Sequence, residues 1–112
     1  MRLLLFILCI SFVSFSNENV TENESKFAQF IVVDVDNREK AITIDEFMRS
    51  QPGVSVSRMD HISKKYLIIF SSDMSYDHTY FLKTFESLGY TIKCYRDGIH
   101  GKDAIVHQTP DC

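Results

Sequence analysis

Hydrophobic residues in this chain switch between strand-like and helix-like spacing, and the order of those switches limits the folds that it can adopt. Residues 27–35, FAQFIVVDV, are β-branched, aromatic and apolar on both faces, which predicts a central strand. Residues 54–59, VSVSRM, alternate in part, and residues 66–70, YLIIF, form a second buried run. The polar residues between these two runs predict a hairpin.

Two other segments have the spacing of amphipathic helices. The first is expected to end at Pro52-Gly53, and the second to begin at a Ser75 cap and end at Gly89. Their apolar stripes consist of Ala41, Ile44, Phe47 and Met48 in the first helix and Phe81, Leu82, Phe85 and Leu88 in the second.

Residues 91–95, TIKCY, alternate as a last strand, with Ile92 and Cys94 expected on one face. The order strand, helix, strand, strand, helix, strand predicts an α+β fold. It is the order of a ferredoxin-like βαββαβ sandwich, a four-stranded antiparallel sheet with both helices on one face. We place this domain at residues 27–96, and expect residues 97–112 to be a tail that adds an edge strand or lies on the surface.

The N-terminus predicts export. Residues 1–16, MRLLLFILCISFVSFS, have the basic start, apolar run and small terminal residues of a cleaved signal peptide, and the run is too short to span a membrane. The protein is therefore expected to be secreted or periplasmic. Residues 17–26 are expected to be a disordered polar lead-in, which contains glycosylation sequons at Asn19 and Asn23.

Charge and cysteines narrow the function further. The formal net charge of −3 disfavours binding to nucleic acid or anionic lipid. Cys94 and Cys112 remain after removal of the signal peptide, and in an oxidising compartment they are expected to form a disulfide worth on the order of 3 kcal/mol. The alternative is a buried Cys94 with a free terminal thiol.

Residues 34–47, DVDNREKAITIDEF, look like the exit of a calcium-binding EF-hand loop. If Glu46 is the bidentate ligand at position 12, Val35 occupies position 1 and Lys40 occupies the glycine position. Valine has no side-chain oxygen and lysine does not favour the sharp turn, so we interpret the segment as a polar loop that leads into a helix.

Residues 52–54, PGV, after the first helix, and residues 85–92, FESLGYTI, before the last strand, stand in the order and at the separation of a known family. Over residues 27–96 the chain resembles the heavy-metal-associated domain of copper chaperones and metal-transporting ATPases. That family binds soft metal through an M-x-C-x-x-C loop after the first strand. Here Val35 replaces the methionine and Asn37 and Lys40 replace the cysteines, so the resemblance implies the fold without the copper site.

Two alternatives remain at the C-terminal end. The residue types of a zinc or copper site occur at Cys94, His100, His107 and Cys112, although their spacing matches no short-loop zinc pattern. Residues 89–105, GYTIKCYRDGIHGKDAI, also resemble the signalling domain of Toll and interleukin-1 receptors, with His100 in place of a proline. That domain has a five-stranded parallel sheet and is longer than this chain, so only a truncated form would fit.

The chain has none of the catalytic patterns that we considered, including G-x-S-x-G, H-E-x-x-H and a glycine-rich phosphate loop, and we expect no enzyme activity and no cofactor. The expected function is a small exported interaction or structural module that contacts another protein through an edge strand or the loop Asn37, Arg38, Glu39 and Lys40. Soft-metal binding or delivery, with copper or zinc at the C-terminal cysteines and histidines, is the alternative. An inhibitory or propeptide-like module is a third possibility.

Overall fold

The computed structural model describes residues 24–112. The predicted signal peptide, most of the predicted lead-in, and both sequons lie outside the described residues. The elements are β1 (Ser25–Val32), α1 (Arg38–Arg49), β2 (Val54–Met59), β3 (Lys65–Ser71), α2 (His78–Ser87) and β4 (Ile92–Ile99).

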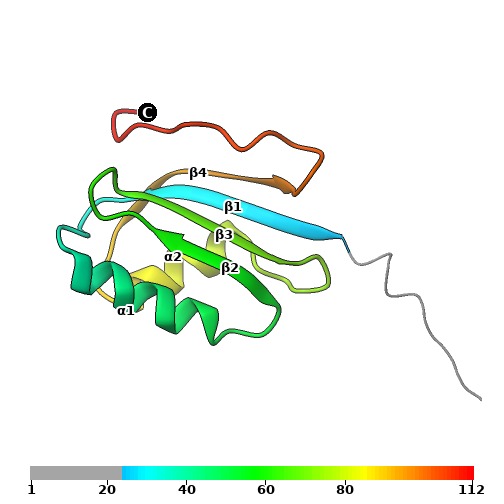
Figure 1. The fold of residues 1–112 in the computed structure, drawn as a ribbon, viewed down its shortest axis with the longest axis horizontal. Coiled ribbons are helices and arrows are strands. Elements are labelled where there is room, and N and C mark those ends of the chain that lie inside the picture. Colours follow the sequence, from blue (N-terminus) through cyan, green and yellow to red (C-terminus); the bar gives the residue numbers. More distant parts are fainter. Residues whose placement is uncertain (1–23) are drawn as a thin grey trace, which may run out of the picture.

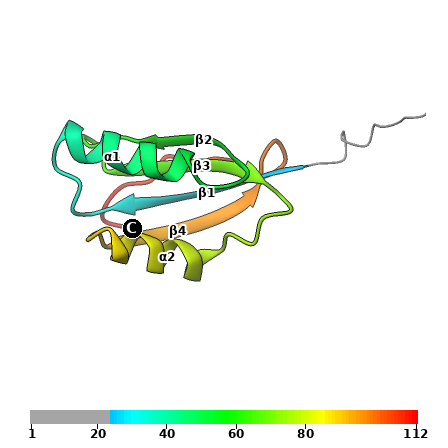
Figure 2. The same ribbon diagram turned by 90° about the horizontal axis from the view of Figure 1, so that it is seen from below.

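The four strands form one sheet in the order β2-β3-β1-β4, and every neighbouring pair is antiparallel. Both helices lie on one side of the sheet, and the chain after β4 crosses the other side (Figure 1). The view from the helix side shows the same layers, with the helices in front of the strands (Figure 2). The predicted ferredoxin-like α+β arrangement is confirmed, and the alternative with a parallel sheet does not fit because no pair is parallel.

Side-chain caps fix where the helices begin. Asn37 accepts a hydrogen bond from the Lys40 backbone N–H and starts α1. Asp77 does the same for α2 through the Tyr80 N–H, so the predicted Ser75 cap is wrong by two residues. Gly89 follows α2 with a φ of +94°, a conformation that side chains disfavour.

Aromatic side chains between the sheet and the helices form the main core. The Phe30 ring, at the centre of β1, lies 5.0 Å from the Tyr66 ring, 5.2 Å from Phe85 and 5.6 Å from Phe81, measured between centroids. Apolar burial of this kind is the dominant favourable term in folding. The predicted stripes of both helices contribute Ala41, Ile44, Met48, Phe81 and Phe85.

The observed strands differ from the predicted ones at their ends. β1 begins at Ser25, which pairs with Ser71, and ends at Val32 rather than at residue 35, because the chain turns toward α1 there. β4 continues to Ile99, past the predicted end at residue 95, because it pairs with β1 as far as Lys26. The domain thus uses residues that the sequence analysis assigned to the lead-in and to the tail.

Candidate binding groove on the open face of the sheet

The face of the sheet opposite the helices consists of rows of side chains that run across all four strands. One row joins Arg58 on β2, Leu67 on β3, Gln29 on β1 and Arg96 on β4, each aligned with the next by strand pairing. Gln29 is only 5% exposed, whereas Leu67 is half-buried and Arg58 is exposed. Burial therefore falls from β1 toward β2, which shows that something covers only part of this face.

The cover is the C-terminal end of the chain, residues 104–112, which we call the C-terminal strap. It lies along the side of the sheet opposite the helices (Figure 1). Beneath it, Phe27 and Ile31 on β1 are fully buried, although neither belongs to the aromatic core cluster. The predicted tail therefore forms a thin second layer, and it adds no edge strand among residues 104–112.

Polar contacts hold the backbone of the strap at Ala104 and Val106. The Gln29 side-chain amide donates to the Val106 carbonyl (2.8 Å) and accepts from the Val106 N–H (3.0 Å). The Arg96 guanidinium donates both to the Gln29 side-chain oxygen and to the Ala104 carbonyl, each at 2.6 Å. The bonds to Gln29 are partly buried, so leaving one of these groups unpaired would cost more than the bond contributes.

A sharp turn after β4 directs the strap back across the sheet. Asp103 accepts from the Ile99 N–H through its carboxylate and donates its own N–H to the Ile99 carbonyl. Gly98 makes this possible, since a Cβ there would lie 2.8 Å from the Asp103 Cβ and 3.0 Å from the Phe27 ring. A glycine at residue 98 is thus required by close approach rather than by backbone conformation.

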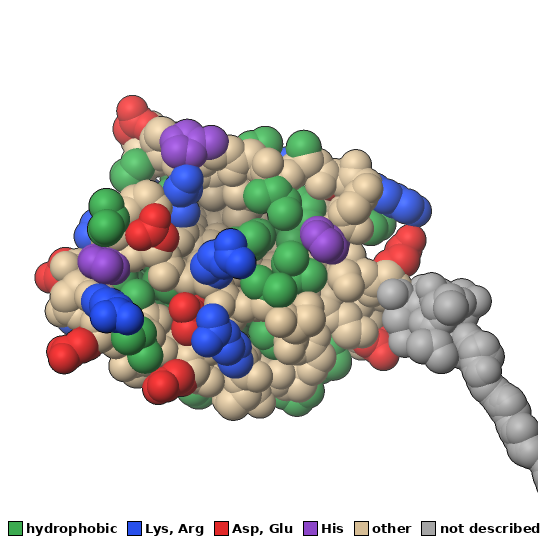
Figure 3. All heavy atoms as spheres, viewed as in Figure 1, with side chains coloured by type: hydrophobic (Ala, Val, Ile, Leu, Met, Phe, Trp, Pro, Cys, Tyr) green, Lys and Arg blue, Asp and Glu red, His purple; other side chains and the backbone are tan. Residues whose placement is uncertain are grey.

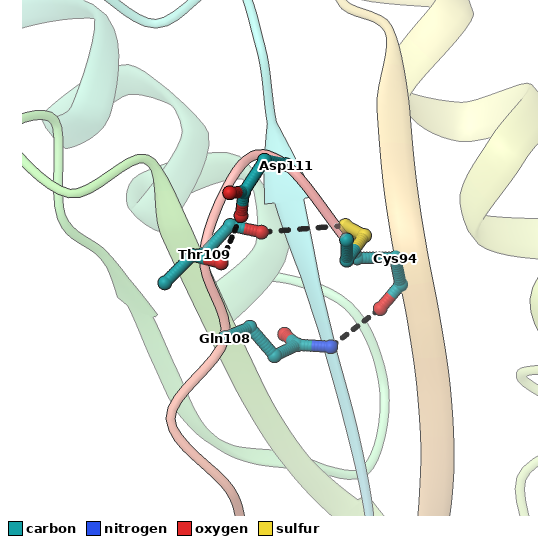
Figure 4. Close-up of a disulfide and its surroundings, with 5 residues drawn as sticks. Cys94, Gln108, Thr109 and Asp111 are labelled. Carbon is teal, nitrogen blue, oxygen red and sulfur yellow. Dashed lines mark hydrogen bonds between the residues drawn. A yellow bond between two sulfur atoms is a disulfide. The ribbon is translucent and has the colours of Figure 1, made fainter.

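A disulfide between Cys94 and Cys112 fastens the end of the strap to β4, with the two Cα atoms 6.0 Å apart. Figure 4 shows the surroundings of this bond. The Gln108 side chain donates to the Cys94 carbonyl (2.5 Å), and the Cys94 sulfur lies 3.7 Å from the Thr109 carbonyl oxygen. The predicted disulfide is confirmed.

A β-bulge brings Cys94 to the strap side. Gln29 pairs with Arg96 and Ile31 with Lys93, so Cys94 and Tyr95 together oppose one residue of β1. Cys94 has a φ of 63°, a conformation that is uncommon for a residue with a side chain. The expectation that Ile92 and Cys94 share a face is therefore wrong, because alternation is interrupted at the bulge.

Beside the strap, the uncovered part of the sheet forms an open groove of about 240 Å³. Its apolar lining includes Leu67 from β3 and Ile105 and Val106 from the strap, and its polar lining includes Arg58 and Lys65. Figure 3 shows hydrophobic side chains gathered in the hollow below the strap, with Lys and Arg side chains beside them. The remaining lining residues are Gln29, Asp60 and Tyr66.

The charged residues at this groove are two cations and one carboxylate. The Asp60 carboxylate accepts from the Ser63 hydroxyl (2.8 Å) and the Ile62 N–H (3.0 Å), and these two bonds, in that order, lower its pKa. The Lys65 amine lies 2.8 Å from His107 Nδ1. Within residues 24–112, Arg58 has no side-chain hydrogen bond or ion pair. The groove therefore presents a free guanidinium next to an apolar floor.

The predicted contact loop has a structural role. Asn37 caps α1, and the Lys40 amine pairs with the Asp36 carboxylate at 3.0 Å, which through this hydrogen bond lowers the pKa of Asp36. Arg38 and Glu39 are exposed, and Val35 is buried. Asn37 is thus a helix cap, and Lys40 is one partner of an ion pair.

The four residues considered for zinc or copper do not come together as one group of ligands. Cys94 and Cys112 are joined in the disulfide, and His107 contacts Lys65. His100 lies at the turn after β4, where its backbone N–H donates to the Ser25 carbonyl. In the described part of the chain, no three His, Cys, Asp or Glu side chains are grouped as metal ligands.

The edge strand β2 is partly occupied by side chains of α1. The Asp60 N–H, just after β2, donates to the Lys65 carbonyl on β3. Because backbone groups alternate in direction along an antiparallel strand, those of Ser57 and Met59 point outward, away from β3. Arg49 donates to the Ser57 carbonyl (2.9 Å), and Asp45 accepts from the Met59 N–H (3.1 Å). These bonds leave that half of β2 unsuited to pairing with a partner strand.

Asp45 also accepts a 2.9 Å hydrogen bond from the Ser57 hydroxyl, which lies 2.7 Å from the Tyr66 hydroxyl. Burial raises the pKa of Asp45, and the bonds from Ser57 and Met59 oppose that rise. A serine beside a carboxylate is also found at catalytic sites, but Ser57 is 1% exposed and its hydroxyl is bonded to Asp45 and lies beside Tyr66. The network connects α1 to β2 and β3.

A second cavity, of about 270 Å³, lies at the other end of the sheet beside α2. Its carboxylates are already bonded: Asp77 caps α2, and Asp97 accepts from the Tyr95 hydroxyl at 2.8 Å. The Tyr95 ring stacks on His78 at 4.3 Å. These contacts fix the start of α2 against β4. The carboxylates of this cavity are therefore less available to a ligand than the Arg58 guanidinium at the first groove.

The sequence pattern did not predict Gln29, Arg58 or Lys65 as site residues. A signal existed for Gln29, because it is the one polar residue in the apolar run FAQFIVV and had to meet a partner when buried. Arg58 and Lys65 resemble ordinary surface cations in the sequence, since only the strap's path makes them the rim of a groove.

Comparison with known protein families, curated proteins and solved structures finds no match for this chain. Within residues 24–112, no helix is both long enough and apolar enough to cross a membrane.

Proposed function

We propose that this protein is a small exported, non-catalytic interaction domain that binds another protein through the groove beside the C-terminal strap. The observation that carries the proposal is the groove of about 240 Å³ with apolar lining from Leu67, Ile105 and Val106. Concave apolar surfaces with a few polar groups are typical binding sites.

Export is supported by the signal-like residues 1–16 and by the disulfide, because disulfides persist mainly in oxidising compartments. The resemblance to the heavy-metal-associated domain supports an ancestral fold whose metal loop was replaced by an Asn37 cap and an Asp36–Lys40 pair. In this proposal the loop of residues 37–40 is not the main contact, since Asn37 and Lys40 are engaged within the domain.

The test is selection of peptides from a random display library on the disulfide-bonded chain of residues 17–112. Selected peptides are then measured against Ile105→Glu, which places a charge in the groove from the exposed strap. The matched control is Ile62→Glu, because Ile62 is 81% exposed in the β2–β3 turn and does not line the groove.

We expect peptides that bind the unmodified chain and the control, and that lose binding to Ile105→Glu. Circular dichroism and a free-thiol count on each variant establish that it is folded with its disulfide closed. Failure to enrich any peptide, or peptides that bind both variants equally, would contradict the proposed groove.

A further inference from the structure

We infer that the groove selects an extended peptide segment that carries a carboxylate close to an apolar side chain, with Arg58 as the carboxylate's partner. This inference rests on the proposed function and names the chemistry of its ligand. It depends on three features: an apolar floor, a free guanidinium, and a local charge opposite to that of the whole protein.

The apolar floor has a fixed relation to the cation. Arg58 and Leu67 are directly paired across β2 and β3, so their Cβ atoms are about 5 Å apart on the same face. In an extended peptide, side chains that point to one face are two residues apart, roughly 7 Å along the chain. A ligand with an apolar residue and a carboxylate at positions i and i+2 therefore fits this pair.

Among the described residues, Arg58 is the cation at the groove whose side chain has no hydrogen-bond or ion-pair partner. Of the two carboxylates near it in the fold, Asp45 accepts from Ser57 and Met59 on the helix side, and Asp60 accepts from Ile62 and Ser63. A guanidinium presents several N–H donors in a planar fork that matches a carboxylate, and Arg58 is exposed, so a ligand can reach these donors. Lys65 is a second cation at the groove, shared with His107.

The local charge contrasts with the bulk charge. The whole chain has a formal net charge of −3, yet the groove is lined by two cations and a single, internally bonded carboxylate. An acidic ligand would be repelled by most of the surface and attracted at this site. Charge complementarity of this kind contributes mainly to specificity and association rate.

The experiment uses peptides from the display selection, each synthesised a second time with its Asp or Glu changed to Asn or Gln. Binding is measured by fluorescence polarisation to the disulfide-bonded chain, to Arg58→Gln, and to Arg38→Gln as the matched control. Arg38 is an exposed arginine at the start of α1 and does not line the groove.

We expect the carboxylate peptides to bind Arg58→Gln about tenfold more weakly, the usual effect of losing one charge-assisted hydrogen bond. Their amide forms should bind the unmodified chain with a similar loss, and Arg58→Gln should weaken the amide forms no further. Arg38→Gln should leave every dissociation constant unchanged.

Amide peptides that bind as tightly as their carboxylate forms would overturn the inference. If those peptides still lose binding to Ile105→Glu, the interaction groove stands and only the acidic specificity falls. The chain's own N-terminal segment is the competing acidic occupant: a tenfold gain of peptide binding on changing both Glu18 and Glu22 to Gln would assign the groove to that segment and overturn the inference.

Discussion

The two faces of the sheet are covered in physically different ways. On the helix face, interlocked rings around Phe30 exclude water through apolar contact. On the opposite face, a single extended segment is held by the Gln29 side chain, Arg96 and a disulfide. The first cover is nondirectional and extensive, whereas the second depends on a few specific bonds, so the second is the easier one to remove.

The two faces of the sheet therefore have different roles in the domain. The helix face determines whether the chain folds, and the strap face determines what surface the folded chain presents. The groove exists because the strap is too narrow to cover β2 and β3 as well as β1 and β4, which leaves Leu67 half-buried beside Val106.

The largest expected effect is on the helix face. Phe30→Ala removes the ring at the centre of the aromatic cluster and is expected to lower the free energy of unfolding by about 3–5 kcal/mol. Urea unfolding followed by circular dichroism measures it. Phe47→Ala is the matched control, because Phe47 is substantially exposed on α1, and its loss should be far smaller. Equal losses of unfolding free energy in the two variants would contradict the conclusion that the cluster around Phe30 is the main core.

The next effect is on the disulfide. Replacing both Cys94 and Cys112 with Ser opens a link between residues 18 apart in sequence, and the free energy of unfolding should fall by about 3 kcal/mol. Limited proteolysis should then cut residues 104–111 first and leave the sheet intact. The unmodified chain should show no free thiols and an intact mass two units below the reduced value, by the loss of two hydrogens. Two free thiols with a retained zinc or copper ion would favour the metal-binding alternative instead.

A smaller effect is expected at Gln29. Gln29→Leu keeps the size of the side chain but leaves the Val106 N–H and carbonyl without partners, which should cost about 1–2 kcal/mol. Gln29→Glu is the contrasting variant: it keeps the oxygen that accepts from Val106 and Arg96 but places a second acceptor against the Val106 carbonyl, so only that one bond is lost. Hydrogen exchange should show faster exchange of the Val106 amide in Gln29→Leu while the amides of β1 and β3 remain protected. Loss of protection throughout the sheet would mean that the two faces are not independent.

The smallest effect is at Asp45, where its sign depends on pH. Burial raises the pKa of Asp45 above its unfolded value near 3.9, so the folded state binds the proton more tightly. The resulting stabilisation is complete below pH of about 3.9 and is lost as pH rises through the folded pKa. Asn cannot titrate and keeps the acceptor for Ser57 and Met59, so Asp45→Asn should be more stable relative to the unmodified chain at pH 7 than at pH 3.5, by about 1 kcal/mol or less.

Urea unfolding at the two pH values checks this prediction. Asp45→Ala is the contrasting variant: it removes the acceptor and should cost about 1–3 kcal/mol at both pH values. A relative stability of Asp45→Asn that is the same at pH 3.5 and pH 7 would show that Asp45 does not titrate differently in the folded state.

Much of the fold was readable from the sequence because its information is local and periodic. The run FAQFIVV indicated a strand buried on both faces, and both of its faces are indeed covered. Of the eight residues in the predicted helix stripes, the structure buries Ala41, Ile44, Met48, Phe81 and Phe85. Phe47 and Leu82 are exposed and Leu88 is half-buried, because they lie at the margins of the stripes. Element ends were less accurate, because the caps and strand ends depend on neighbours that the local pattern does not specify.

The candidate site was hardly readable, since its contacts join residues far apart in sequence. Gln29 meets Val106 across 77 residues, and Arg96 meets Ala104 through a turn that requires Gly98. The sequence of the strap has no periodic hydrophobic pattern that would predict its position. It is held through its backbone N–H and carbonyl groups, and these are present whatever the side chains are. The predicted disulfide was the single indication that the tail would be fastened to the domain.

The sequence by itself determined the order of strands and helices, the placement of both helices on one face of the sheet, and the absence of cysteine between β1 and α1. Only the tertiary structure decided where the last nine residues lie, that a bulge at Cys94 directs its sulfur to them, and that Arg58 borders an apolar groove. The physical reason is the distance in sequence between the interacting residues. Hydrophobic spacing can be recognised within a single helix or strand, whereas the shape of a groove depends on how several elements pack together.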